Sequence, residues 1–327
     1  MEDEPSVPEF GFSRSARHYA WVRRTQLWIF ALAAVVIVGG GALVVLGMRD
    51  GGGVLPSALT FGGGSATPTG SPTPTGPSPE ELAKQERAKR VKALDAALKT
   101  YAASTPEFSV AVLDKKTGAR YSYRGAEKYD TASIVKVQVL ACALLKAQDA
   151  DRDLTASELA LAKPMIRLSD NNATTSLFNK LGKVSAITKC NKRLGLSQTA
   201  VNNAWGLTKT TVNDQVRLLA ELVDSKGPLD TDSRKLAFTL MSSVDDTQDW
   251  GVPAIAKTGE TSTVKNGWDT RSADGGLWAV NTVGRVVSTD DDVDVSVAVL
   301  SHNNETMDGG ITLVQKVAAM TRQYLKY

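Results

Sequence analysis

Two residues three positions apart carry the first chemical signal in the chain. Ser133 and Lys136 lie in the stretch from 129 to 136, and in a helix they would share one face, about one turn apart. A serine hydroxyl is a poor nucleophile near pH 7 and needs a base beside it. A lysine can be that base, and a helix N-terminus at Ser133 would add partial positive charge. The spacing predicts an acylated serine, but residues 262–265 repeat it, so the prediction depends on the rest of the chain.

Charge and residue types limit which chemistry is available. The 327-residue chain has a net charge of only +3, which does not indicate a surface that binds nucleic acid. Its two histidines and two cysteines are too few for a zinc site. We therefore expect no metal and no cofactor, and a serine hydrolase built on this chain has to use lysine or a carboxylate as its base.

The two cysteines, Cys142 and Cys190, leave two alternatives open. In an exported domain they can pair as a disulfide. Otherwise they are buried thiols that pack as small apolar side chains. Nothing in the sequence fixes the distance between them, so both alternatives stand.

The N-terminal part predicts a membrane anchor. Residues 1–26 are polar and contain several arginines, and residues 27–48 contain no charge. About 20 apolar residues suffice for a helix to cross a bilayer. Positive charge before the span predicts a single-pass protein of the cell membrane, with a cytoplasmic tail at 1–26 and an extracytoplasmic C-terminus. A cleaved signal peptide is the alternative, although the apolar run is long for one.

A linker separates the anchor from the folded domain. Residues 49–79 are rich in Gly, Ser, Thr and Pro, and such a segment cannot bury enough apolar surface to order itself. The folded domain is predicted at 80–327. Ser78 and Pro79 come before two glutamates there, which is the pattern of a helix N-terminus.

Periodicity predicts the first elements of the domain. A helix to about Tyr101 is followed by a hairpin with strands at 108–114 and 120–124. The segment after Ser133 is locally ambiguous, because valines alternate as in a strand while the following residues suit a buried helix. A helical block comes next, and Pro164 is expected to break or kink its first helix.

The C-terminal part returns to strands. Alternating apolar residues predict strands at 262–265, 277–283 and 293–301, and an amphipathic helix at 311–324 closes the chain. The whole order predicts an α+β fold. It has a five-stranded antiparallel sheet flanked by N- and C-terminal helices, with an all-helical subdomain inserted between the strand groups. A cleft between the two parts is a natural ligand site.

Two further polar clusters follow Ser133 along the chain. Ser-Asp-Asn at 169–171 lies at a break between two predicted helices, and Lys-Asn-Gly-Trp at 265–268 lies at the end of a predicted strand. The first offers a hydroxyl and a carboxamide. The second offers an ammonium and a glycine that lets a ligand approach the backbone. Together these clusters would supply a nucleophile, a proton relay and an anion-binding edge.

This set of motifs resembles the penicilloyl serine transferases, specifically the class A β-lactamases, which carry S-x-x-K, S-D-N and K-T-G. The resemblance covers about residues 81–327. It implies the fold predicted above and assigns a role to each position. The resemblance implies that Ser133 is the acylated nucleophile and that Lys136 is its base or proton relay. It implies that Ser169 donates a proton to the leaving nitrogen, that Asn171 binds the substrate amide and that Lys265 binds the substrate carboxylate. Asn266, Gly267 and Trp268 would form the strand edge beside the substrate, and backbone N–H groups of Ser133 and Trp268 would form the oxyanion hole.

The third motif has a rival at Lys257, which begins a literal Lys-Thr-Gly. The resemblance implies that this motif's strand is followed by two more strands and a terminal helix. The predicted strands at 277–283 and 293–301 would be those two strands. The strand before them, at 262–265, contains Lys265. We therefore favour Lys265, with Asn266 in place of the usual threonine.

The resemblance also exposes a gap. Class A enzymes release the acyl group with a glutamate on a loop that corresponds to residues 194–210, and this stretch contains no Asp or Glu. The expected function is thus an acyl-enzyme at Ser133 formed with a β-lactam or a peptidoglycan peptide. A penicillin-binding or D,D-peptidase-like protein with slow deacylation is the alternative, as is a catalytically idle ligand-binding or sensing module.

Overall fold

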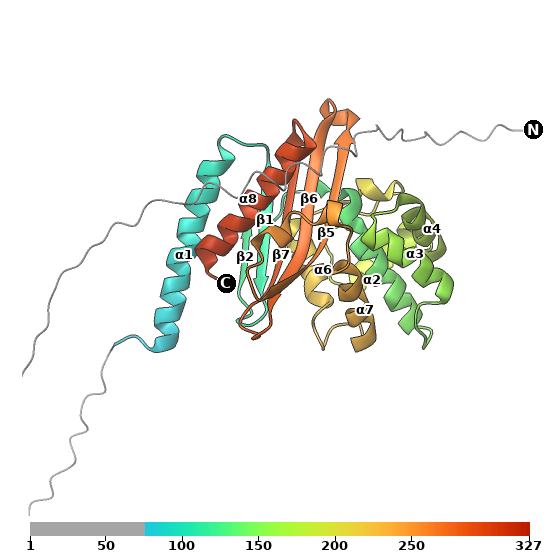
Figure 1. The fold of residues 1–327 in the computed structure, drawn as a ribbon, viewed down its shortest axis with the longest axis horizontal. Coiled ribbons are helices and arrows are strands. Elements are labelled where there is room, and N and C mark those ends of the chain that lie inside the picture. Colours follow the sequence, from blue (N-terminus) through green and yellow to red (C-terminus); the bar gives the residue numbers. More distant parts are fainter. Residues whose placement is uncertain (1–75) are drawn as a thin grey trace, which may run out of the picture. The chain divides into compact units, whose positions relative to one another are not determined.

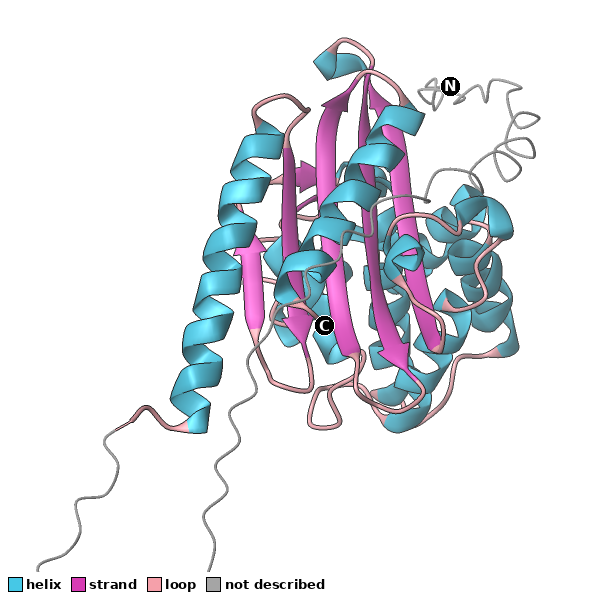
Figure 2. Ribbon diagram, turned by 60° about the vertical axis from the view of Figure 1, so that its left-hand side comes forward, coloured by secondary structure: helices cyan, strands magenta, loops and turns pink. Residues whose placement is uncertain are grey.

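A five-stranded antiparallel sheet lies at the centre of the computed structural model, which describes residues 76–327 (Figure 1). The strand order is β2-β1-β7-β6-β5, and helices cover both faces (Figure 2). Its strands are β1 (Phe108–Asp114), β2 (Arg120–Tyr123), β5 (Glu260–Arg271), β6 (Leu277–Ser288) and β7 (Asp294–Asn304). The predicted α+β class and five-stranded sheet are confirmed.

The two faces of the sheet belong to different hydrophobic cores. Along β1, Phe108, Val110 and Val112 pack into one core, and Ala111 and Leu113 pack into the other. Successive side chains of a strand point to opposite faces. Both sets are apolar here, so β1 is buried on both sides, as expected for the inner strand of a three-layered domain.

Two long helices cover the first face. They are α1 (Pro79–Ala102) and α8 (Met307–Leu325), which pack against each other and the sheet. The predicted start of α1 is present: the Ser78 hydroxyl accepts from the backbone N–H of Glu81, and the Glu81 carboxylate accepts from the N–H of Ser78. This capping box satisfies N–H groups that have no partner within the helix.

The helical subdomain covers the second face. It consists of α2 (Val135–Gln148), α3 (Ala156–Arg167), α4 (Asn171–Leu181), α5 (Lys183–Arg193), α6 (Val212–Glu221) and α7 (Thr231–Met241). Nearly every residue of α2 is buried, so this helix is apolar on all sides and forms the centre of the subdomain. The segment after Ser133 is therefore a helix, and its valine alternation does not mark a strand.

Several predicted boundaries were wrong. The strand predicted at 262–265 is the twelve-residue β5, which includes the whole Lys-Asn-Gly-Trp motif. Pro164 was expected to break or kink its helix, and the break is wrong, because Pro164 lies inside α3, which continues to Arg167. Sequence patterns also missed a second sheet of two short strands, β3 (Tyr129–Asp130) and β4 (Lys209–Thr210). Strands of two residues are too short to show periodicity.

The predicted tail, anchor and most of the linker, at 1–26, 27–48 and 49–79, fall largely outside the described residues. Within 76–327 no helix is both long and apolar enough to cross a membrane. The anchor thus stays a prediction from the sequence.

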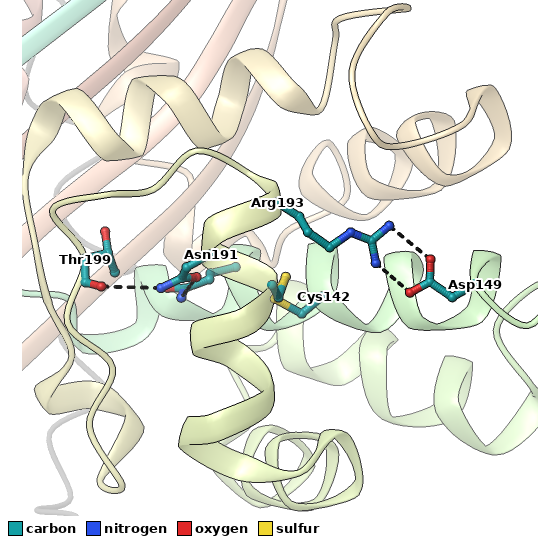
Figure 3. Close-up of a disulfide and its surroundings, with 7 residues drawn as sticks. Cys142, Asp149, Asn191, Arg193 and Thr199 are labelled. Carbon is teal, nitrogen blue, oxygen red and sulfur yellow. Dashed lines mark hydrogen bonds and ion pairs between the residues drawn. A yellow bond between two sulfur atoms is a disulfide. The ribbon is translucent and has the colours of Figure 1, made fainter.

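Cys142 on α2 and Cys190 on α5 form a disulfide, which decides between the two alternatives for these cysteines (Figure 3). Their Cα atoms are 5.7 Å apart. Nearby, the Arg193 guanidinium donates two hydrogen bonds to the Asp149 carboxylate. Both contacts join the two helices across 48 and 44 residues of sequence.

Removing this disulfide should destabilise the domain. Because the bond restrains a loop of 48 residues in the unfolded chain, a Cys142→Ala/Cys190→Ala double variant should lose about 2–4 kcal/mol of unfolding free energy. Urea unfolding followed by circular dichroism measures this loss. Wild-type protein from an oxidising host should not react with a thiol reagent when denatured without reductant. Free thiols there, or a double variant of wild-type stability, would contradict the disulfide.

Candidate active site

Ser133 lies on a tight turn between the two sheets and the buried helix. The chain leaves β3, passes through a single 3₁₀ turn, η2 (Ala132–Ile134), and enters α2. Ala132 has φ of +44°, a conformation that non-glycine residues rarely adopt. The Asn281 amide on β6 donates to the backbone carbonyls of Asp130 and Thr131, at 2.9 and 3.1 Å. This side chain, which sequence reasoning missed, ties the turn to the sheet.

Lys136 lies one turn after Ser133 and is completely buried. Its Nζ is 2.7 Å from Ser133 Oγ, 2.8 Å from the Ser169 carbonyl, 3.0 Å from Ser169 Oγ and 2.8 Å from Asn171 Oδ1. An ammonium has only three N–H groups, so these four oxygens use all of its donor capacity. The predicted Ser–Lys pair and the Ser-Asp-Asn cluster therefore meet in one site.

Burial changes the acidity of Lys136. Loss of solvation, opposed by the nearby Asp170 carboxylate, lowers the pKa of its ammonium to about 7. The four oxygens that contact its Nζ belong to two hydroxyls, a backbone carbonyl and a side-chain amide, and none of them is a carboxylate oxygen. At neutral pH a large fraction of Lys136 is thus the neutral amine, which can accept a proton from Ser133 Oγ.

The turn between α3 and α4 presents Ser169 and Asn171. Ser169 has φ of +58°, and its carbonyl accepts from Lys136 Nζ. The Asp170 side chain is the N-cap of α4 and accepts from the backbone N–H of Ala173 at 2.7 Å. Asp170 therefore has a local structural role, while its two neighbours point at the lysine.

Lys265 approaches the same hydroxyl from the sheet. Its Nζ lies 3.0 Å from Ser169 Oγ and 2.8 Å from the Asn266 carbonyl, and its side chain is fully buried. Burial, and secondly the charge on Lys136, lower the pKa of Lys265 well below its ordinary value. Ser169 Oγ thus bridges two amines from different parts of the fold, an arrangement suited to passing a proton.

Gly267 lets β5 pass directly beside the Ser133 turn. A Cβ at this position would lie 2.7 Å from the backbone nitrogens of Ser133 and Ile134, so any side chain would push the strand away from the nucleophile. β5 is an edge strand, paired only with β6. An edge strand keeps unpaired backbone groups on its free side, and these can bind a ligand next to Ser133.

The side chains of Asn266, Trp268 and Lys257 have other surroundings than Ser169 Oγ. Asn266 is buried, and its amide donates to the carbonyls of Gln248 and Trp250. Trp268 packs against Trp250 on the α1/α8 side of the sheet, with ring centroids 5.8 Å apart. Lys257 is exposed in the turn before β5. Of the two candidate lysines, only Lys265 contacts the serines and amides of the site.

Trp205 completes the surroundings of Lys136 and was not predicted. It lies on the 3₁₀ turn η3 (Trp205–Leu207), between α5 and α6, with its ring centroid 4.9 Å from Lys136 Nζ. Trp205 is followed by a glycine in a loop, and no sequence motif marks it as a residue of the site. The stretch 194–210, where the resemblance implies a deacylating carboxylate, thus presents an aromatic ring to the lysine.

A search against models of protein families matches this chain over residues 87–159 and 148–325 to the β-lactamase enzyme family. The chain belongs to the β-lactamase enzyme family. Its match spans the sheet, the helical subdomain and all the site residues described above. Membership establishes a hydrolase-like fold of the serine type for this β-lactamase-family protein.

Solved structures agree with this fold at low sequence identity. An ancestral class A β-lactamase is 20% identical, with a TM-score of 0.61, covering 70% of this chain and 99% of its own. The chromosome-encoded β-lactamase of Vibrio parahaemolyticus is 16% identical, with a TM-score of 0.60, 71% of this chain and 99% of its own. TLA-1 extended-spectrum β-lactamase is 17% identical, with a TM-score of 0.64, and the match covers 72% of this chain and 99% of that one. These likenesses concern the fold alone.

Sequence relatives exist in mycobacteria. "Putative lipoprotein LppW" of Mycobacterium bovis and of Mycobacterium tuberculosis is 27% identical over 175 residues, which are 51% of this chain and 55% of that protein. The chain thus spans about half the length of the curated relatives it matches. These relatives are named as lipoproteins, and their name gives no reaction.

The acidity of Lys136 predicts how labelling of Ser133 depends on pH. If the amine accepts the serine proton, the rate of acylation by a covalent probe should rise with pH through about 7, the pKa of Lys136, and level off above it. Below that pH the neutral fraction, and hence the rate, should fall about tenfold per unit. Stopped-flow labelling from about pH 5 to about pH 9 measures this profile. A flat profile would show that Lys136 is not the base.

Proposed function

We propose that this protein is a membrane-anchored, extracytoplasmic serine hydrolase that forms an acyl-enzyme at Ser133 with a β-lactam or a peptidoglycan-like peptide. The observation that supports it most is the buried Lys136 amine, which contacts Ser133 Oγ and both Ser169 and Asn171. A lysine held among hydroxyls, with its pKa lowered to about 7, is suited to activate a serine without histidine.

Acylation follows from these contacts. Neutral Lys136 accepts the proton of Ser133 Oγ as that oxygen bonds to the substrate carbonyl carbon, and backbone N–H groups beside Gly267 stabilise the resulting oxyanion. The C–N bond then breaks. The proton passes from Lys136 through Ser169 Oγ, 3.0 Å away, to the leaving nitrogen. The products are an ester at Ser133 and a neutral amine that carries the former serine proton, with Lys136 neutral again, so atoms and charge balance.

The substrate class is proposed from the groups at the edge of the site. A substrate carboxylate near Lys265 would favour its protonated form, because an opposite charge offsets the burial that now lowers its pKa. Asn171 Oδ1 accepts from Lys136, and its Nδ2, for which residues 76–327 supply no acceptor, would donate to a substrate amide carbonyl. An amide and a carboxylate flanking the scissile bond are features of penicillins and of peptides ending in a free carboxyl group.

A second candidate is a penicillin-binding or D,D-peptidase-like protein that releases its acyl group slowly, or an idle sensing module. It is favoured because no carboxylate contacts Ser133 or Lys136 within residues 76–327. Hydrolysis of the ester needs a base for the attacking water. Lys136 is the base in contact with Ser133, and it is already engaged by four oxygens.

The location is proposed from the sequence. The uncharged span at 27–48 would hold the protein in the lipid bilayer, and the Pro- and Gly-rich residues 49–79 would carry the domain outward. The disulfide between Cys142 and Cys190 suits an oxidising, extracytoplasmic compartment.

Intact mass tests the acyl-enzyme directly. Mixing the protein with a penicillin should add one penicillin mass to the wild type and nothing to a Ser133→Ala variant, because the nucleophilic oxygen is gone. A Ser262→Ala variant is the matched control, since it removes the serine of the second S-x-x-K and should label like wild type. Absence of an adduct and of substrate turnover in the wild type would refute the proposed chemistry.

Two lysine variants test the substrate contact. Lys265→Gln should lower the second-order acylation rate by about tenfold to a hundredfold, the usual effect of losing a hydrogen bond to a charged group. Lys257→Gln changes an exposed lysine in the preceding turn and should leave the rate unchanged. Labelling kinetics with a fluorescent penicillin measure both. The opposite pattern would assign the carboxylate to Lys257.

A further inference from the structure

The Trp205 ring lies against one side of the Lys136 amine. Its centroid lies 4.9 Å from Lys136 Nζ, a contact that favours a cation over the ring face. The indole Nε1–H donates to Thr175 Oγ1 on α4 at 3.1 Å. The ring is half-buried against the core of the helical subdomain. It is thus held between the buried lysine and the edge of α4.

The backbone on either side of the ring is fixed to the nucleophile's own turn. Thr131 Oγ1 lies 3.5 and 3.3 Å from the carbonyls of Trp205 and Gly206, and the Thr131 N–H donates to the Thr208 carbonyl at 2.9 Å. A Cβ on Gly206 would lie 3.9 Å from the Ala132 Cα. The loop therefore rests on the turn just before Ser133.

Buried polar contacts anchor the same loop at its ends. The Asp214 carboxylate on α6 accepts from the backbone N–H of Gln198 at 2.8 Å and from Thr199 Oγ1 at 2.6 Å. Thr199 Oγ1 also lies 2.8 Å from Thr210 Oγ1, so the beginning and end of the loop are joined. A loop closed at both ends and seated on the Ser133 turn leaves Trp205 little freedom to swing away.

Four oxygens and one aromatic ring surround the Lys136 amine. Its Nζ lies within hydrogen-bond distance of oxygens of Ser133, Ser169 and Asn171, and the Trp205 ring lies on the side toward η3. Hydrolysis of an ester at Ser133 requires a water to attack the carbonyl carbon while a base takes its proton. In residues 76–327 the base that contacts Ser133 is Lys136. If the proposed ester forms, its release depends on whether water reaches this amine.

We infer that Trp205 is a shielding residue that keeps water from Lys136 and from the ester at Ser133, and so makes the acyl-enzyme long-lived. This inference rests on the proposed acylation of Ser133. It assigns the ring to the release step and leaves bond formation at Ser133 to the groups already described. Trp205 is in these terms a positioning residue, because it acts through the lysine.

Separate measurement of acylation and release tests the inference. The protein is labelled with a fluorescent penicillin, free label is removed, and loss of the adduct is followed over time. Trp205→Ala should lose its label at least about tenfold faster than wild type, with an acylation rate within about threefold. Trp205→Phe keeps an aromatic face over the lysine and should release slowly. Trp278→Ala, on the α1/α8 side of the sheet, should behave as wild type.

Equal release from Trp205→Ala and wild type would overturn the shielding role. If Trp205→Ala forms no adduct, methylation of Lys136, which needs no substrate, decides on the shielding role. If the wild type forms no adduct, the proposed function fails, and a second measurement then decides on Trp205 independently.

That second measurement needs no substrate. Reductive methylation with formaldehyde and cyanoborohydride modifies accessible neutral amines, and peptide mass spectrometry locates them. Lys136 in the unacylated Trp205→Ala variant should be methylated at least about fivefold more than in wild type, because the amine becomes open to solvent. Exposed Lys257 is the internal reference. Equal methylation of Lys136 in both proteins would overturn the inference whatever the result with penicillin.

Discussion

The arrangement of the site depends on the hydrogen bonds of one buried lysine, Lys136. Lys136 is fully buried, and its amine contacts oxygens of Ser133, Ser169 and Asn171. Burying an amine without such partners costs several kcal/mol. The helix α2 and the turn before α4 must therefore stay in register, since a small shift would leave the amine unsatisfied. The same burial lowers its pKa to about 7 and gives the lysine its chemical use.

The sheet supplies the second half of the site through backbone proximity. Gly267 allows β5 to lie against the Ser133 turn, and Asn281 holds that turn through two carbonyls. Lys265 then reaches Ser169 Oγ from the strand. Rigid elements of both halves thus fix the reactive groups, which favours preorganisation over closure of a mobile loop. The disulfide between α2 and α5 restrains the helical half further.

The loop between α5 and α6 lies beside Lys136 and the turn that carries Ser133. Its ends are joined by Asp214, Thr199 and Thr210, and its centre presents Trp205 to the lysine. Bond formation needs the lysine in contact with Ser133, and that contact is present. In the proposed mechanism release needs water and a base, and the Trp205 ring lies 4.9 Å from the Lys136 amine. This contact is the ground on which we propose a long-lived ester at Ser133.

The sequence by itself determined the layered α+β fold, the order of the motifs and the Ser133–Lys136 pair, because periodicity, caps and short spacings are local properties. It did not determine the disulfide, the full length of β5, the course of α3 through Pro164 or the positions of Trp205 and Asn281. Those depend on contacts between segments distant in the chain, for which no local pattern exists. The order of the strands favoured Lys265 over Lys257, but only the tertiary structure placed Lys265 Nζ 3.0 Å from Ser169 Oγ, since that contact joins residues 96 positions apart in the chain.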